Sequence, residues 1–226
     1  VVSHPLRLSG ARTPSVLATA AGAAVLLLAW CGPLPGLARE DFVAHMSLHI
    51  AVVALAAPLL ALGLSACDES DRAATVALPA AVIELVIVWA WHAPALHHLA
   101  RQHLAWFALE QAGFLASSLA VWWGALATAR PSCRHALPGG VASLLMTSTH
   151  MTLLGVLLAL APRALYEHGA STTLDAQRAG GLVMLLGGGI SYLAGALSLV
   201  FIALRDGGVA TVRLSIATEN TEEERV

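Results

Sequence analysis

The sequence predicts an all-α membrane protein, a bundle of about six transmembrane helices without a separate soluble domain. Of its 226 residues, 58% are hydrophobic and only 12% are charged, about half the charged share of a typical soluble domain. An apolar run of about 18 residues is long enough for a helix to cross the hydrocarbon core of a bilayer. The chain contains six such runs, at residues 14–31, 42–64, 76–96, 103–128, 138–161 and 178–204.

The first run follows an arginine-containing start, as the apolar centre of a signal peptide would. Its length is that of a membrane span, however, and no clear Ala-x-Ala cleavage site follows it. We therefore expect a retained first helix, with residues 1–13 as a cytoplasmic segment before a bundle of residues 14–204. Residues 205–226 form a second cytoplasmic segment, whose polar and acidic composition predicts disorder.

Arginine counts in the loops predict how the bundle is oriented, because short cytoplasmic loops are enriched in basic residues. With both termini inside, eight arginines fall on the inner side and four on the outer side, so N-in and C-in is the predicted topology. This orientation places eight of the ten histidines toward the outer half of the membrane: His45, His49, His92, His97, His98, His103, His150 and His168.

Composition also argues against several classes of function. A net charge of −2 provides no basic surface for nucleic acid. The cysteines Cys31, Cys67 and Cys133 are far apart and form no Cys-x-x-Cys motif, so neither a disulfide framework nor a zinc knuckle is indicated. No arrangement of nucleophile and base is apparent, and we do not expect an enzyme.

The segment "HMSLH" is the first candidate for chemistry. His45 and His49 are four residues apart, so both imidazoles project from one face of a helix, and Met46 borders that face. Two imidazoles with a thioether suit copper, whereas imidazoles alone also suit zinc, iron or haem. The alternative is a pair of interfacial histidines that bind headgroups or loop carbonyls.

Ionisable residues deeper in the apolar runs are further candidates, because such groups are costly in a bilayer and usually face the bundle interior or a cavity. His92 lies near the outer end of the third run, with Glu84 two turns deeper and Pro94 expected to end or kink the helix. His150 lies roughly 18 Å below the outer end of its helix. At that depth it needs a partner inside the bundle, either a metal or a hydrogen-bonding group.

Other polar or soft side chains are candidates for supporting roles. Glu110, beside Gln111, is suited to orient an imidazole or to make an interhelical hydrogen bond. Met184, within a glycine-rich run that predicts close helix packing, is either a ligand or a core residue. Asp175 and Gln177 are expected in the outer loop before the last helix, as an N-cap or as polar partners.

Several stretches, in this order, resemble the CtaG family of integral-membrane cytochrome c oxidase assembly factors, which is associated with caa-type oxidases. They are "HMSLHIAVVALAAPLLALG", "WHAPAL" followed by "LEQAGFLASSLAVWW", "HMTLLGVLLALAPRALY" and "TLDAQRAGGLVM". The resemblance covers roughly residues 44–204. It implies a metallochaperone role in the assembly of respiratory cytochrome c oxidase, in a bacterial inner membrane, with copper provided to the catalytic centre.

The same resemblance implies the partners, and it matches His45, His49, His92 and His150 to the histidines of the family. The expected partners are subunit I of the oxidase or other assembly factors, besides the lipid bilayer. We predict an outward-facing site for copper, as Cu(I), in which Glu84 and Glu110 orient ligands or carry protons. The predicted ligands are His45, His49, His150, His92, Met46 and Met184.

Two other functions remain open at this stage. The first is a b-type haem membrane redox protein, with histidines from two helices as axial ligands. The second is a metal-free assembly scaffold, in which the histidines are incidental. A transporter with a central metal site would need an inward exit, yet the inner half of the predicted bundle has almost no ligands.

Overall fold

The computed structural model describes residues 12–65, 72–166 and 173–205, and all regular structure within these ranges is helical. The predicted segments 1–13 and 205–226 lie almost wholly outside the described residues. His168 lies outside them as well. The elements in chain order are α1 (Arg12–Cys31), α2 (Leu34–Ala38), α3 (Phe42–Ile50), η1 (Ala51–Ala56), α4 (Ala57–Ser65), α5 (Arg72–Trp91), α6 (Pro94–Gln102), α7 (Leu104–Ala127), η2 (Pro131–Ala136), α8 (Leu137–Ala159), α9 (Leu174–Met184) and η4 (Leu185–Gly189).

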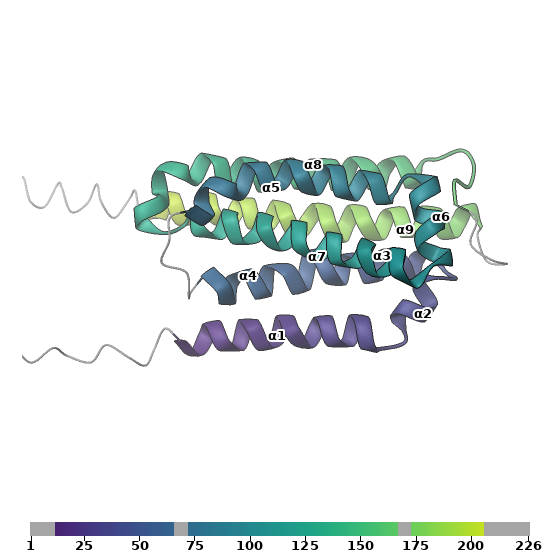
Figure 1. Cartoon of the computed structure of the whole chain (residues 1–226). Coiled ribbons are helices and arrows are strands. Elements are labelled where there is room, and N and C mark those ends of the chain that lie inside the picture. The colour runs from purple at the N-terminus through teal and green to yellow at the C-terminus, as the bar shows by residue number, and fades with distance from the viewer. Residues whose placement is uncertain (1–11, 66–71, 167–172, 206–226) are drawn as a thin grey trace, which may run out of the picture.

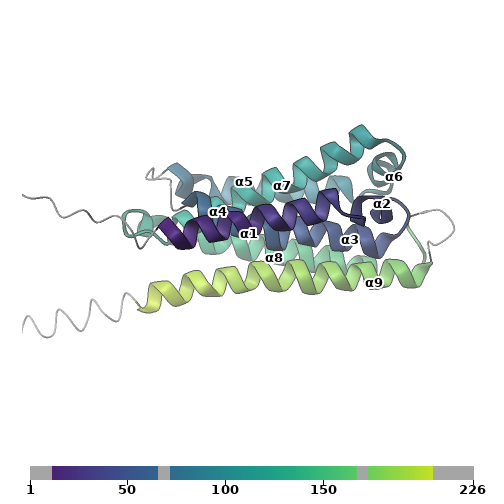
Figure 2. The same cartoon turned by 90° about the horizontal axis from the view of Figure 1, so that it is seen from below.

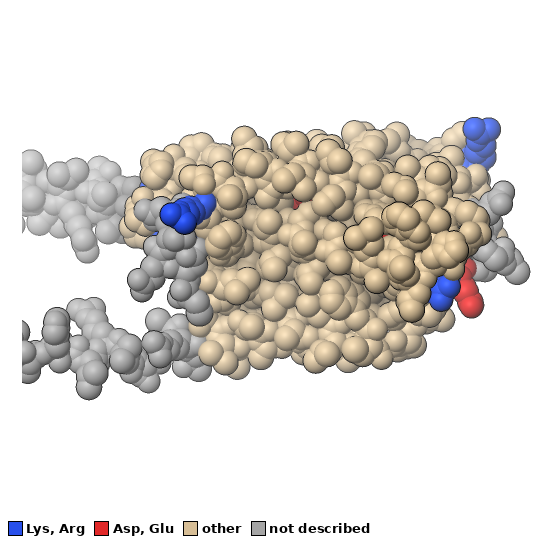
Figure 3. All heavy atoms as spheres, in the orientation of Figure 1, with Lys and Arg blue, Asp and Glu red and all other residues tan. Residues whose placement is uncertain are grey.

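The predicted fold class, a bundle of membrane-spanning helices, is confirmed. Within the described residues, five helices are long and apolar enough to cross a membrane, and α1 is a further apolar helix. Prominent charged side chains sit at the two ends of the elongated molecule in the face that Figure 3 shows. The five spans are Phe42–Ser65, Arg72–Trp91, Leu104–Ala127, Pro131–Ala159 and Leu174–Arg205.

The long helices run side by side, and two short helices lie across one end (Figures 1 and 2). Helix α5 packs against α7 and α8, α9 packs against α3 and α8, and α1 packs along α4 at the edge of the bundle. The short helices α2 and α6 lie at the end where α1 finishes, opposite the end where the last helix finishes at Arg205. We call the end that carries α2 and α6 the capped end.

The predicted third run, 76–96, is two helices rather than one. Helix α5 ends at Trp91, and α6 begins at Pro94 after an extended residue, Ala93 (φ −66°, ψ 132°). A residue before proline disfavours the helical conformation, whereas proline at the first position of a new helix leaves no hydrogen bond unmade. The segment expected to be mostly loop is therefore a helix that covers the capped end.

The last helix begins four residues earlier than its hydropathy predicts. Thr173 is its N-cap, and the hydroxyl oxygen accepts a hydrogen bond from the backbone N–H of Ala176 at 3.1 Å. Asp175 and Gln177 therefore lie in the first turns of α9 and not in the loop before it, and neither is the N-cap. Because the first turn of α9 is polar, a prediction based on apolar residues places the start of the helix too late.

Two glycines bring the backbones of α8 and α9 into contact. A Cβ atom added at Gly155 would lie 2.8 Å from the carbonyl oxygen of Gly181, and one added at Gly181 would lie 2.7 Å from the carbonyl oxygen of Gly155. Because the opposing atoms are backbone, no side-chain rotation can relieve the clash. Small residues commonly allow this close approach between membrane helices.

We predict that Gly155→Ala lowers the free energy of unfolding in detergent by about 1–3 kcal/mol through overpacking. Gly139→Ala, in the same helix, is the matched control, because a Cβ there meets no atom within 4 Å. The control gains helix propensity of up to about 1 kcal/mol and should not destabilise the protein. Equal effects of the two substitutions in thermal unfolding would contradict the close contact.

Candidate metal site

Four buried imidazoles come together at the capped end of the bundle. His45 and His49 project from α3, His92 follows the last residue of α5, and His97 lies on α6; none is more than 4% exposed. Ring centroids are 4.7 Å apart for His45 and His97, 6.1 Å for His45 and His92, and 5.4 Å for His49 and His92. Elements separated by about 50 residues of sequence thus form one cluster, which we call the histidine cluster.

His92 is oriented as metal-binding histidines commonly are. Its Nδ1–H donates to the carbonyl oxygen of Val88, with the two atoms 2.6 Å apart, so the lone pair of the ring is on Nε2. Burial lowers the pKa of His92 well below its usual value, because the charged imidazolium loses its hydration. The Nε2 atom is buried and makes no hydrogen bond, which leaves a lone pair for a ligand.

His49 adds a second imidazole with unused nitrogens. The side chain is fully buried, and neither Nδ1 nor Nε2 makes a hydrogen bond to any residue that the structure describes. Its ring packs edge-on against Phe114 at 4.2 Å between centroids and against His92 at 5.4 Å. An unpaired buried polar atom costs about 1–3 kcal/mol, so a histidine in this position needs a compensating partner.

His150 on α8 has the same character. It is 4% exposed, and both of its ring nitrogens are buried without a hydrogen bond in the described part of the chain. It lies close enough to His49 and His92 for charges on these rings to interact. His49, His92 and His150 therefore each have a ring nitrogen without a hydrogen bond among the described residues, but their ligand atoms, unlike those of His45, His97 and Glu110, do not all lie within 4.8 Å of one another.

A buried arginine holds the outer part of the histidine cluster. One terminal nitrogen of Arg101, Nη1, donates to the carbonyl oxygen of Ala38 at 2.9 Å and to Nδ1 of His45 at 2.7 Å. The other, Nη2, forms a salt bridge with Glu110, whose side chain is fully buried. This network joins α6 to α3, to α7 and to the end of α2.

The hydrogen bond from Arg101 determines what His45 can do. Arginine has no lone pair, so Nδ1 of His45 is the acceptor, and a neutral ring must carry its hydrogen on Nε2. Ligand atoms of His45, His97 and Glu110 lie within 4.8 Å of one another, close enough for a metal ion. In this conformation the guanidinium of Arg101 binds both His45 and Glu110, in the place that a metal ion would otherwise take. His45 therefore has no lone pair for a metal.

The two candidate methionines lie in the apolar core between helices. Met46 is fully buried and faces α9, where its Cγ is 3.1 Å from the position that a Cβ at Gly180 would take. Met184, on α9, is also fully buried in the main apolar cluster. Both methionines are therefore surrounded by apolar core residues, as expected for the alternative in which Met184 packs in the core and binds no metal.

Glu84 belongs to a second polar cluster and touches none of the four imidazoles through its hydrogen bonds. Its carboxylate accepts from Thr147 Oγ1 at 2.9 Å and from the Tyr192 hydroxyl at 2.7 Å. Glu84 precedes His92 by eight residues, about 12 Å along a helix. Its hydrogen bonds join α5, α8 and the last helix, an interhelical role.

The remaining predicted polar residues support the helices around the site. Gln111 donates to Glu110 at 3.4 Å and accepts from the Trp30 indole at 3.3 Å. Gln177 is fully buried; its amide donates to the carbonyl oxygen of Leu158 at 3.2 Å, near the end of α8. Asp175 is exposed and forms an ion pair with Arg178, at 3.5 Å.

Sequence reasoning assigned no site role to His97 or Arg101, which it treated as residues in or beside a loop. The signal that could have found them is their spacing: His97 and Arg101 are four residues apart in a segment that Pro94 is suited to begin as a helix. On one helical face, both point inward with Ala100. Buried histidine and arginine on one face indicate a polar interior rather than a solvated loop.

We predict that Arg101→Met destabilises the protein by about 3–5 kcal/mol, because Glu110 is left buried without its counter-ion. Adding Glu110→Gln removes the unpaired charge and should restore much of this loss. Arg178→Met, which breaks an exposed ion pair, is the matched control and should change stability by less than about 1 kcal/mol. Unfolding in detergent measures all three; an Arg101→Met effect no larger than the control would contradict the buried network.

Comparison with known families agrees with this architecture. The sequence pattern of the cytochrome c oxidase caa3 assembly factors, Caa3_CtaG, matches residues 68–206, more than half of the chain. The match contains α5 to α9, with His92, His97, Arg101, Glu110 and His150, and begins after the segment that carries His45 and His49. Comparison with curated proteins and with solved structures gives no significant match. The chain belongs to the caa3-type cytochrome c oxidase assembly factor family.

Proposed function

We propose that this assembly factor binds Cu(I) in the histidine cluster and passes it to the catalytic subunit of the oxidase, subunit I, or to another assembly factor. The observation that carries the proposal is the pair His49 and His92, two buried imidazoles with nitrogens to which no group of the described residues hydrogen-bonds. His150 is the third ligand. The proposed setting is a bacterial inner membrane, with the capped end facing outward.

The chemistry of the donor set favours a monovalent soft ion. Imidazole nitrogen is a good ligand for copper, and the three proposed ligands are neutral when they bind. Because the cost of moving an ion out of water rises with the square of its charge, neutral ligands in a buried site suit Cu(I) better than Cu(II). Glu110, the carboxylate beside His45 and His97, is already neutralised by Arg101.

A carrier must also release its cargo. Three neutral imidazoles without a thiolate form an incomplete and weaker set than the closed cysteine cages of structural metal sites. Arg101 keeps His45 and Glu110 from adding to the set. The weak coordination is consistent with transfer rather than storage, and it requires no catalysed covalent step.

Close packing of the rings favours an ion over the alternative of haem. His49 contacts both His92 and Phe114 edge-on, at 5.4 and 4.2 Å between centroids. A porphyrin between two axial histidines would need these rings to separate. The metal-free scaffold leaves the unpaired nitrogens of His49 and His150 without a physical purpose.

We predict that His49→Ala and His92→Ala each weaken Cu(I) binding by about 10–100-fold or more, the scale expected for losing a group from a metal site. The measurement is competition with a chromophoric Cu(I) chelator, on the full-length chain in detergent. His135→Ala is the control, because this histidine is exposed and lies on η2, before α8. Equal Cu(I) affinity in all variants would contradict the proposed ligands.

The same variants separate the rival functions in cells. We expect the His49→Ala, His92→Ala double variant to lower the copper content of the assembled oxidase. A normal copper content with this variant would favour a metal-free scaffold. A Soret band in the purified wild-type protein that disappears in the variant would favour haem.

A further inference from the structure

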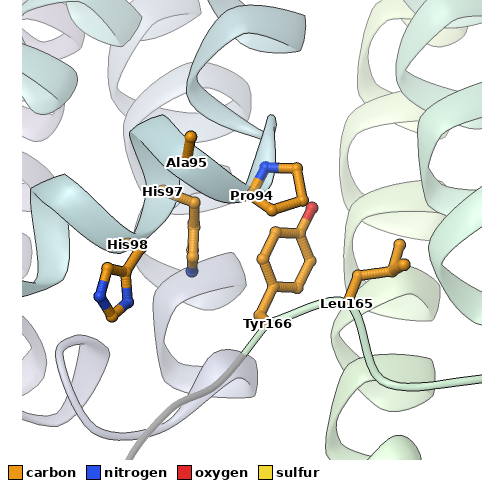
Figure 4. Close-up of a pocket in the computed structure, with 6 residues that line it drawn as sticks. All are labelled: Pro94, Ala95, His97, His98, Leu165 and Tyr166. Atoms are coloured by element: carbon orange, nitrogen blue, oxygen red, sulfur yellow. The ribbon is translucent and has the colours of Figure 1, made fainter.

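A surface pocket of about 330 Å³ opens beside the histidine cluster at the capped end. It lies between the start of α6 and the segment that follows α8 (Figure 4). We call it the α6 pocket. Its lining residues are Pro94, Ala95, His97, His98, Leu165 and Tyr166.

His97 separates the α6 pocket from the buried imidazoles. It lines the pocket, yet its side chain is only 1% exposed. Its ring also lies 4.7 Å from His45 in a perpendicular arrangement. From His45, the next ring centroid is that of His92 at 6.1 Å, and His49 follows at 5.4 Å from His92. A single imidazole layer therefore stands between the pocket and the remaining rings.

His98 offers an imidazole on the outer side of the same pocket. It is exposed, and its Nε2 accepts a hydrogen bond from the side-chain amide N–H of Gln102, with the two nitrogens 2.8 Å apart. This exposed hydrogen bond must open before His98 can bind an ion through Nε2. Figure 4 shows His98 and His97 on consecutive positions of the helix, both beside the pocket. The pocket thus combines one imidazole open to solvent with one that borders the interior.

Tyr166 fixes the opposite wall of the α6 pocket. Its ring stacks on Phe42 at 4.8 Å and lies 4.5 Å from His97. Its hydroxyl donates to the backbone carbonyl of His92 at 2.7 Å. The wall of the pocket is therefore attached directly to a proposed ligand, so the two features have a fixed relative position.

A second hollow near the site is a poor route for an ion. A groove of about 560 Å³ passes His150 between α5 and α8, and its lining is otherwise mostly apolar. It lies along two membrane-spanning helices, where lipid chains would cover it. An unsolvated ion entering there would have to cross hydrocarbon, which is strongly unfavourable. The α6 pocket lies instead at an end of the bundle, beyond the Arg72–Trp91 span.

We infer that the α6 pocket is the port through which Cu(I) enters and leaves the histidine cluster, with His98 as the first ligand and His97 as the second. This inference rests on the proposed copper function and adds the route to it. Passage at His45 requires Arg101 to release Nδ1 of that ring. If Arg101 also releases Glu110, the ligand atoms of His45, His97 and Glu110, which lie within 4.8 Å of one another, form a three-ligand stopping point between the port and His92.

The test compares rates with stoichiometry in the full-length chain in detergent. Ala95→Leu fills the mouth of the port at an exposed position. We expect Cu(I) uptake, and its extraction by a hydrophilic chelator, to slow by about tenfold or more while the bound copper per chain stays unchanged. Thr149→Leu places the same side chain in the groove beside His150 and should change neither rate.

His98→Ala tests the first ligand in the same assay. We expect Cu(I) uptake to slow several-fold, whereas His103→Ala, which removes an exposed imidazole at the other end of α6, should leave it unchanged. Normal rates in Ala95→Leu, or slow rates in Thr149→Leu alone, would overturn the port and leave the copper site standing. Absence of bound Cu(I) in the wild-type chain would overturn the proposed function and the port with it.

Discussion

The buried ion pair between Arg101 and Glu110 is the interaction on which the capped end depends. Breaking such a pair by removing one partner is costly, because the other charge stays desolvated. The pair positions α6 over α7, and further hydrogen bonds of Arg101 attach it to the end of α2 and to His45. Since α6 carries His97 and α3 carries His49, the same guanidinium sets the distance between the surface pocket and the unpaired imidazoles.

The helices were predictable from sequence, because each apolar run is long and bilayer thickness fixes the length that a span requires. The end of α5 before Pro94 was predictable from the proline, whereas the helix that begins at Pro94 and the start of α9 after Thr173 were less predictable, because neither lies in a long apolar run. Of the site, His92 and His150 were identifiable by the cost of burying an ionisable group. His97 and Arg101 were not, because their burial results from α6 folding over the bundle, a tertiary event that hydropathy does not report. Glu84 was assigned correctly as a buried group, but its partners Thr147 and Tyr192 come from distant helices.

The bundle separates its buried polar groups into two sets with different properties. Both carboxylate oxygens of Glu84 accept hydrogen bonds. This set therefore stabilises the packing of the helices, and neither oxygen is left without a partner. Among the described residues, nitrogens of His49 and His92 in the histidine cluster, and of His150 on α8, have no hydrogen-bond partner. Native interiors rarely leave such groups unpaired, which is consistent with a ligand at the histidine cluster. A π-helical turn, η1, begins two residues after His49, and such irregular turns are frequent at functional sites.

X-ray absorption at the copper edge, on the Cu(I)-loaded full-length chain, tests the proposed ligands most directly. We predict a shell of imidazole nitrogens without sulfur, since Met46 and Met184 lie in the apolar core. The signal should be lost in the His49→Ala, His92→Ala double variant. Sulfur in the shell, or an unchanged spectrum in the double variant, would contradict a copper site built on His49 and His92.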